Sequence, residues 1–173
     1  MPPEPEPDEI LCRRAAGGDK GAFRLLVETH ERRLRAFLGQ LAGPDLGDEL
    51  AQETFIKAWQ SLAAFRGEAK FSSWLCAIGW RLFLDQKRRQ RSESRKRDGA
   101  AELAETVAQP SAGEGVDLAR ALALLEPVER AALVLCEGHG WSHGEAAEIL
   151  RIPLGTLKSS VRRAKLKCRE HLK

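Results

Sequence analysis

The chain has 173 residues, enough for one domain or two small ones and too few for a large multidomain assembly. With 43% hydrophobic and 31% charged residues it can form a packed core, and its net charge of +3 is too small to indicate a partner. The longest apolar runs hold six or seven residues, against the ~20 that a membrane-spanning helix needs. The start, residues 2–9, is acidic and proline-rich, unlike an export signal. We therefore expect a cytoplasmic protein without membrane insertion.

The first third of the sequence has the spacing of apolar residues that is typical of helices. Such residues recur every three or four positions over residues 11–41, and a glycine-rich break near Gly18 divides them into one or two helices. After a turn, Asp45 or Asp48 is expected to cap the next helix, which should end before Gly67. These segments predict a helical bundle.

A third helical pattern follows and changes character along its length. Ser72 or Ser73 is expected to cap this helix, whose first part has an apolar stripe. Residues 86–97 follow, with seven basic residues and a single acidic one. No sustained alternation with a period of two occurs in the chain. Residues 8–95 are accordingly predicted to form an all-α domain, and residues 96–115, which are rich in small, polar and acidic residues, a flexible linker.

A second, smaller helical domain is predicted for residues 116–173. Ser142, with Glu145 three positions later, forms a capping-box pattern that opens a short helix. Pro153 suits the first position of the helix after it. That last helix has an apolar stripe, which is expected to lie in the core, and a basic face on the opposite side. The stripe consists of Leu154, Leu157, Val161, Ala164 and Cys168. The basic face consists of Lys158, Arg162, Lys165 and Arg169. This arrangement is typical of a helix-turn-helix whose second helix enters a DNA major groove.

Aromatic residues cluster near the end of the first domain. Seven of the ten in the chain fall between Phe55 and Phe83, and most are expected in the core. Phe65, Phe71 and Trp74, however, lie in or beside a polar loop that also holds cations. Aromatic faces among cations are suited to stacking on unpaired bases.

Three segments together resemble one protein family. They are residues 48–59 (DELAQETFIKAW), residues 65–75 (FRGEAKFSSWL), and the pair 144–150 (GEAAEIL) and 153–159 (PLGTLKS). Their order and separation are similar to those of regions 2 and 4 of extracytoplasmic-function sigma factors, the small initiation subunits of bacterial RNA polymerase. The resemblance implies a region 2 helical bundle and a region 4 helix-turn-helix.

The resemblance also implies a role for particular residues. Core RNA polymerase would contact the acidic helix through Asp48, Glu49, Gln52, Glu53, Ile56 and Trp59. The melted non-template strand of the minus-ten element would contact Phe65, Arg66, Lys70, Phe71, Trp74, Arg88 and Arg89. Duplex DNA at the minus-thirty-five element would contact Ser142, Gly155, Thr156, Lys158, Ser159, Arg162, Arg163 and Lys165. An anti-sigma factor is a further expected partner, while no catalytic residue, cofactor or metal is implied.

The sequence departs from the family pattern at two places and leaves two alternatives open. Trp80-Arg81 stands where an Arg-Asn pair is usual in the family, and Ser159-Ser160 stands where Ser-Arg is usual, so promoter preference is not assigned.

One alternative is an autonomous helix-turn-helix regulator. Such a protein would share the DNA-binding second helix of the motif, but it would not explain the acidic helix and the aromatic loop. A zinc site at Cys136, His139, His143 and Cys168 has suggestive spacing only, because both cysteines lie on apolar patterns. Known hydrolase and nucleotide-binding motifs are absent.

Overall fold

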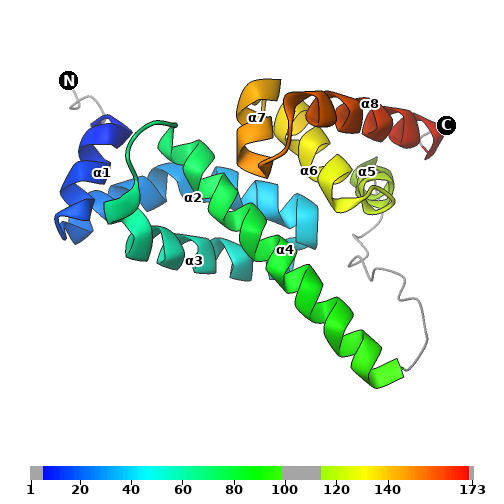
Figure 1. Cartoon of the computed structure of the whole chain (residues 1–173), viewed down its shortest axis with the longest axis horizontal. Coiled ribbons are helices and arrows are strands. Elements are labelled where there is room, and N and C mark those ends of the chain that lie inside the picture. Colours follow the sequence, from blue (N-terminus) through cyan, green and yellow to red (C-terminus); the bar gives the residue numbers. More distant parts are fainter. Residues whose placement is uncertain (1–5, 99–113, 172–173) are drawn as a thin grey trace.

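The computed structural model describes residues 6–98 and 114–171, and within them it is built of helices alone (Figure 1). The first group of helices is α1 (Asp8–Ala16), α2 (Lys20–Ala42), α3 (Pro44–Ser61), the 3-10 turn η1 (Leu62–Ala64) and α4 (Phe71–Asp98). The second group is α5 (Glu114–Ala123), α6 (Pro127–Leu133), the π-helical turn η2 (Val134–Gly138), α7 (His143–Leu150) and α8 (Leu154–His171). The all-α prediction with two small helical domains is confirmed. The middle of the predicted linker, residues 99–113, lies outside the described residues.

In the first domain the predicted glycine break separates α1 from α2. Asp19 caps α2, since its side chain accepts hydrogen bonds from the backbone N–H groups of Gly21 and Ala22 at 2.9 and 3.1 Å. The buried face of α2 includes Leu26, Phe37 and Leu41, which recur at helical spacing as the pattern predicts.

The caps predicted for α3 and α4 were wrong. Pro44 opens α3, where its fixed φ and missing N–H fit the first turn, and no side chain caps this helix. Asp45 therefore lies inside the first turn instead of before it, and Asp48 lies a turn further on. Phe71 begins α4, so Ser72 and Ser73 are inside the helix, and the serine at position 73 is buried.

Two glycines allow α2 and α3 to pack closely. A Cβ atom added at Gly47 would lie 2.5 Å from the Cα atom of Gly39 on α2, which is too close for any real contact. Only glycine at position 47 permits this helix crossing, which fixes how α3 presents its outer face.

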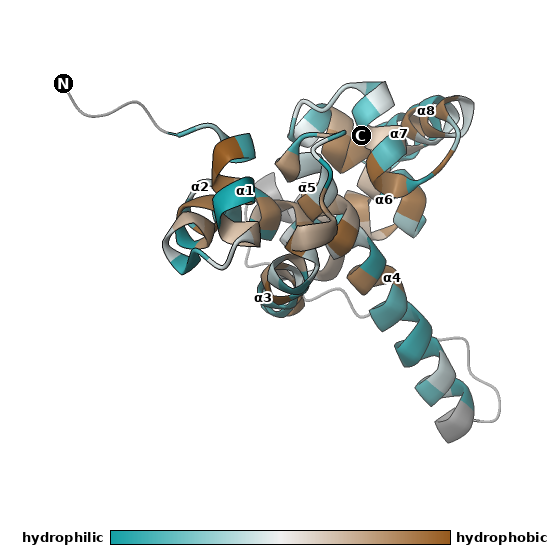
Figure 2. Ribbon diagram, turned by 60° about the vertical axis from the view of Figure 1, so that its left-hand side comes forward, coloured by the Kyte–Doolittle hydropathy of each residue, from teal (hydrophilic) through white to brown (hydrophobic). Residues whose placement is uncertain are grey.

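Helix α4 has two different halves. Its first half is buried in the bundle through residues such as Leu75, Trp80 and Phe83. Its second half is hydrophilic and projects away from the rest of the molecule (Figures 1 and 2). The helix continues to Asp98, three residues into the segment predicted as linker, and α5 begins at Glu114, just before that segment ends.

The second domain has the predicted helix-turn-helix. Ser142 and Glu145 form the expected capping box at the start of α7. Arg151 ends α7 in the left-handed conformation, with φ of 54°, and α8 begins three residues later. Leu157, Val161, Ala164 and Cys168 are buried, but Leu154 is 45% exposed, so the stripe begins one turn later than predicted.

The two domains pack against each other in the described part of the chain. Helix α7 packs against α4, and α6 and η2 contact α2. Arg130 on α6 is buried and donates hydrogen bonds to the carbonyl oxygens of Leu122 at 2.7 Å and of Leu41, at the end of α2, at 2.8 Å. A buried guanidinium that satisfies backbone carbonyls joins the domains more firmly than exposed ion pairs do.

Candidate functional site

One face of α3 carries the side chains predicted to contact core RNA polymerase. Asp48, Glu49, Gln52, Glu53 and Ile56 are all exposed, and Ile56 is 57% exposed although it is apolar. Asp48 pairs with Arg35 on α2 at 3.1 Å. An exposed isoleucine with acidic neighbours is the composition of an interaction surface.

Trp59, predicted on the same face, is placed differently. It is half-buried, and its ring meets the edge of Phe23 with centroids 4.9 Å apart. Much of the Trp59 side chain therefore packs between α3 and α2 and is not part of the exposed face.

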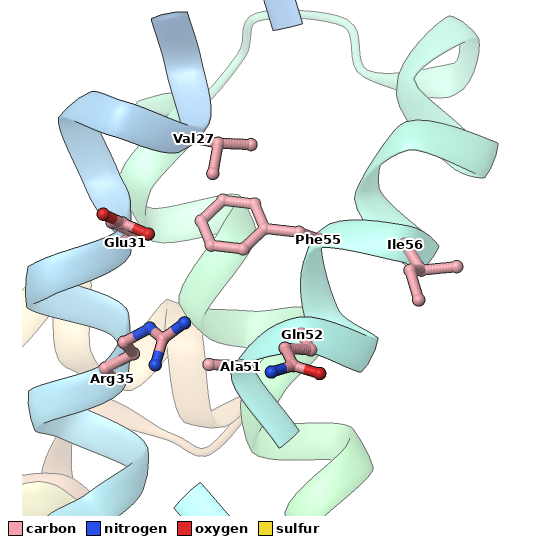
Figure 3. A pocket seen from close by; sticks show the side chains of 7 residues that line it. All are labelled: Val27, Glu31, Arg35, Ala51, Gln52, Phe55 and Ile56. Carbon is pink, nitrogen blue, oxygen red and sulfur yellow. The ribbon is translucent and has the colours of Figure 1, made fainter. Parts of the chain in front are cut away.

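A surface groove of about 250 Å³ lies between side chains of α2 and α3, next to this face (Figure 3). Phe55 reaches from α3 toward Val27 on α2, while Glu31 and Arg35 line the α2 side. The groove has apolar walls and a charged margin, which suits a side chain of a partner helix.

The aromatic residues of the predicted base-binding loop form one cluster. Phe65 and Trp74 are half-buried, with ring centroids 4.9 Å apart, and both contact Phe71. Phe71 itself is only 2% exposed and lies in the core. Phe65 and Trp74 therefore offer aromatic surface at the loop, and Phe71 supports them from below.

A cleft of about 430 Å³ lies beside this loop. Phe65, Phe71 and Lys70 line one side of it, and Asp8 and Glu9 at the start of α1 line another. Asp8 is held by His30, whose ring nitrogen Nε2 lies 2.8 Å from its carboxylate oxygen. The cleft is large enough for a nucleobase, and its walls include a partly exposed aromatic ring.

The cations predicted to follow a phosphate backbone are exposed. Arg66 lies in the loop, and Arg88 and Arg89 lie on the projecting half of α4. Arg88 forms an ion pair with Asp85 one turn earlier. Lys70 is also exposed, but its ammonium is 2.8 Å from the carboxylate of Glu145 in the second domain.

The basic face predicted for α8 is present. Lys158 and Arg162 are exposed, and Lys165 forms an ion pair with Glu137 at 2.8 Å. The polar residues predicted beside them are Ser142, Gly155 and Thr156, which are exposed, and Ser159, which is half-buried. These residues lie at the N-terminal ends of α7 and α8 and on the outer side of α8, which suits docking in a DNA groove.

Arg163 differs from its neighbours because it takes part in an ion-pair network around one buried carboxylate. Its Nε atom donates to Glu129 at 2.9 Å, and Lys167 donates to the same carboxylate at 2.7 Å. Glu129 on α6 is only 5% exposed. Burial raises the pKa of the Glu129 carboxyl, but the hydrogen bonds from Lys167 and Arg163 outweigh burial and lower it below its ordinary value. Helical periodicity gave no sign of this network, because Glu129 lies thirty-four positions before Arg163.

The two departures from the family pattern have structural consequences. Trp80 is buried and stacks on Phe83, with centroids 5.6 Å apart, whereas Arg81 is exposed. Ser160 is buried on the inner side of α8, close to Arg163. Position 160 therefore faces the core in this chain and does not lie on the outer face of α8.

All four cysteines are free thiols. Burial raises the pKa of Cys12 to about 11 and that of Cys76 to about 12, so neither is a thiolate at neutral pH. Within residues 6–98 and 114–171, no three metal-binding side chains converge, and no helix there is long and apolar enough to cross a bilayer.

The two domains match two known protein families. Residues 26–93 match sigma-70 region 2, and residues 116–168 match sigma-70 region 4. The chain is 33% identical to the RNA polymerase sigma factor NccH of Alcaligenes xylosoxydans xylosoxydans, over 95% of this chain and 94% of the relative. It is 35% identical to the ECF RNA polymerase sigma factor EcfG of Rhodopseudomonas palustris, over 78% of this chain and 76% of the relative.

Solved structures give the same result. The sigma factor RpoE of Bartonella quintana, in complex with the anti-sigma factor NepR, matches with a TM-score of 0.76 and 29% identity, covering 87% of this chain and 96% of RpoE. CnrH, in complex with the cytosolic domain of CnrY, matches with a TM-score of 0.72 and 27% identity, covering 95% and 96%. The chain belongs to the extracytoplasmic-function sigma factors of the sigma-70 family. It is a promoter-recognising subunit of RNA polymerase, and this assignment excludes the autonomous regulator that the sequence left open.

Proposed function

We propose that this sigma factor divides its work between its two domains. The first domain, residues 8–95, binds core RNA polymerase and opens the minus-ten element, and the second, residues 116–173, binds the minus-thirty-five element as duplex. The observation that carries this proposal is the separation of three surfaces. The acidic face of α3, the aromatic loop before α4 and the basic face of α8 are formed by different elements.

Polymerase binding rests on the outer face of α3. The carboxylates of Asp48, Glu49 and Glu53 suit basic groups of a large partner, and exposed Ile56 supplies apolar area at the same place. Charge complementarity sets the partner and the association rate, while the buried apolar anchor supplies most of the affinity.

Strand opening rests on the loop at residues 65–70 and on α4. A base that leaves the duplex loses stacking, on the order of a few kcal/mol, and Phe65 and Trp74 offer a replacement surface. Arg88 and Arg89 then attract the phosphates of the separated strand along the projecting half of α4. The chain itself performs no covalent step in this scheme, since RNA synthesis belongs to the polymerase.

Upstream recognition rests on α8. Lys158 and Arg162 lie on its exposed face, where a major groove would present base edges and phosphates.

We also propose an anti-sigma factor as a regulatory partner, because two structural neighbours are complexes with such proteins. We propose that the chain acts in the cytoplasm, because its partner RNA polymerase works there.

Two matched substitutions of exposed apolar residues test the polymerase surface. Ile56→Ser should weaken binding to core polymerase by about tenfold or more, the loss expected for an interface anchor. Leu25→Ser, at an exposed apolar position on α2, should leave it unchanged. Co-purification with core polymerase and run-off transcription from genomic fragments measure the two effects. Equal behaviour of the two variants would refute the surface, and no transcription with the unaltered chain would refute the function.

A further inference from the structure

The cleft beside the minus-ten loop has an acidic wall that the proposed function leaves unexplained. Three carboxylates line it together with the aromatic rings, and they belong to Asp8, Glu9 and Glu68. Lys70 lines it as well, but its ammonium is held by Glu145 at 2.8 Å. Carboxylates repel phosphates, so a surface that bound only the DNA backbone would not gather them. They suit a ligand group that donates hydrogen bonds.

Helix stability accounts for only part of this acidic wall. Asp8 and Glu9 lie in the first turn of α1, where carboxylates interact favourably with the helix dipole. The dipole explains why acids occur at this end of the helix. It does not explain why one of them, Asp8, is fixed against the bundle.

A histidine of α2 fixes Asp8. The Nε2 atom of His30 lies 2.8 Å from the carboxylate oxygen Oδ2 of Asp8, and Nε2 is the donor because a carboxylate only accepts. The His30 side chain is only 13% exposed, and its ring packs against Phe71 with centroids 5.3 Å apart. The other oxygen of Asp8, Oδ1, has no hydrogen-bond partner among residues 6–98 and 114–171. An oriented acceptor is therefore left on the wall of the cleft.

A carboxylate in this place distinguishes bases by their exocyclic groups. A base that has left the duplex is recognised through its Watson–Crick edge. Cytosine, adenine and guanine carry an exocyclic amino group that donates hydrogen bonds, whereas thymine carries carbonyl oxygens instead. A carbonyl oxygen next to a carboxylate would leave two acceptors facing each other without a proton, which is unfavourable.

We propose that Asp8 is a specificity-determining residue for the minus-ten element. Its Oδ1 atom accepts a hydrogen bond from the exocyclic amino group of the base that stacks on Phe65, so the cleft takes a base with an amino group and rejects thymine. His30 is a positioning residue, because it acts on DNA only through Asp8. The inference rests on the proposed function, which assigns Phe65 to an unpaired base. It adds α1 to the recognition surface, although Asp8 precedes residues 26–93, which match sigma-70 region 2.

Two pyrimidine oligonucleotides test this inference. Deoxycytidine and deoxyuridine share a ring without a methyl group, and they differ in bearing an amino group or a carbonyl oxygen at C4. Fluorescence anisotropy of oligo-dC and oligo-dU of equal length, with holoenzyme assembled from core polymerase and this chain, gives the ratio of the two dissociation constants. The unaltered chain should favour oligo-dC by about three- to tenfold, as expected for one hydrogen bond to a partly exposed carboxylate.

Asp8→Asn should remove this preference. Asparagine has the same size, but its amide both donates and accepts, so it suits a carbonyl oxygen as well as an amino group. The matched control is Asp45→Asn, which removes the same charge from the first turn of α3, outside the cleft. Each variant is judged by its ratio, which cancels the effect of the lost charge on both oligonucleotides. Comparison with the control cancels any base preference of the core enzyme.

His30→Phe separates positioning from recognition. Phenylalanine keeps an aromatic ring against Phe71 but donates no hydrogen bond, so Asp8 loses its fixed orientation. The preference for oligo-dC should fall by about two- to fourfold. His30→Gln, whose amide replaces the donor, should retain more of the preference than His30→Phe. A full preference in His30→Phe would overturn the positioning role of His30.

The outcomes separate this inference from the proposed function. Loss of the oligo-dC preference in Asp8→Asn but not in Asp45→Asn supports the inference. Equal ratios in these two variants, or no preference in the unaltered chain, overturn it, and the proposed function stands if the unaltered holoenzyme still initiates transcription. If the unaltered chain neither joins core polymerase nor initiates transcription, the proposed function fails, and the inference fails with it.

Discussion

At the scale of single residues, neighbouring arginines on α8 have different roles. Arg162 is exposed on the face assigned to DNA, whereas Arg163 is bound to the buried carboxylate of Glu129. A buried carboxylate needs its donors, because burial without them is costly. The basic residues of α8 are therefore not one set: some hold the domain together, and others remain available to a ligand.

This difference predicts opposite results for two alanine substitutions. Arg163→Ala should lower the free energy of unfolding by about 1–3 kcal/mol, since Glu129 loses one of two donors. Arg162→Ala should change stability by less than about 0.5 kcal/mol but weaken binding to upstream promoter duplex, with a smaller salt dependence if it contacts a phosphate. Urea denaturation and fluorescence anisotropy at several salt concentrations give the two quantities. Unchanged stability of Arg163→Ala would show that the Glu129 network does not form.

At the scale of helices, the sequence pattern predicted the elements well and their ends less well. Among the described helices, apolar spacing located α2, α4 and α8, and the capping box of α7 was found because it is a local pattern of two residues. The caps of α3 and α4 were mispredicted because a proline and a tight loop start those helices earlier than the nearest polar residue. The crossing of α2 and α3 was not predicted, since the importance of Gly47 depends on a residue of another helix.

This crossing predicts that two glycine-to-alanine substitutions differ in sign. Gly47→Ala places a Cβ atom against the backbone of α2 and should destabilise the protein by about 1–3 kcal/mol. Gly39→Ala adds its Cβ where no atom lies within 4 Å and should stabilise α2 by about 0.5–1 kcal/mol. The free energy of unfolding in urea measures both. Equal effects of the two substitutions would mean that the helices are further apart than described.

At the scale of the whole molecule, the sequence predicted the surfaces but not how they meet. The acidic α3 face, the aromatic loop and the basic α8 face each follow from residue types along one segment. The contact between Lys70 and Glu145 joins residues seventy-five positions apart, and no periodicity or motif links them. Long-range pairing of this kind decides how the predicted surfaces lie relative to one another.

Titration of Glu145 reports directly whether the two domains touch in solution. The hydrogen bond from Lys70, followed by those from Ser142, lowers the pKa of the Glu145 carboxyl to about 2. Because this pKa is lowered on folding, the stabilisation is fully present above the ordinary value of ~4.3 and is lost as the pH falls toward 2. The contribution of the Lys70–Glu145 pair should therefore be constant near neutral pH.

Lys70→Ala should raise the midpoint of the Glu145 titration, followed by carboxyl NMR of the full chain. The new midpoint should stay below ~4.3, because the hydrogen bonds from Ser142 remain. Arg66→Ala, in the same loop but paired with Glu68, should leave the midpoint where it is. A midpoint near 4 in the unaltered chain, or no shift in Lys70→Ala, would mean that α7 and the loop are apart in solution, since no other cation is hydrogen-bonded to this carboxylate among the described residues.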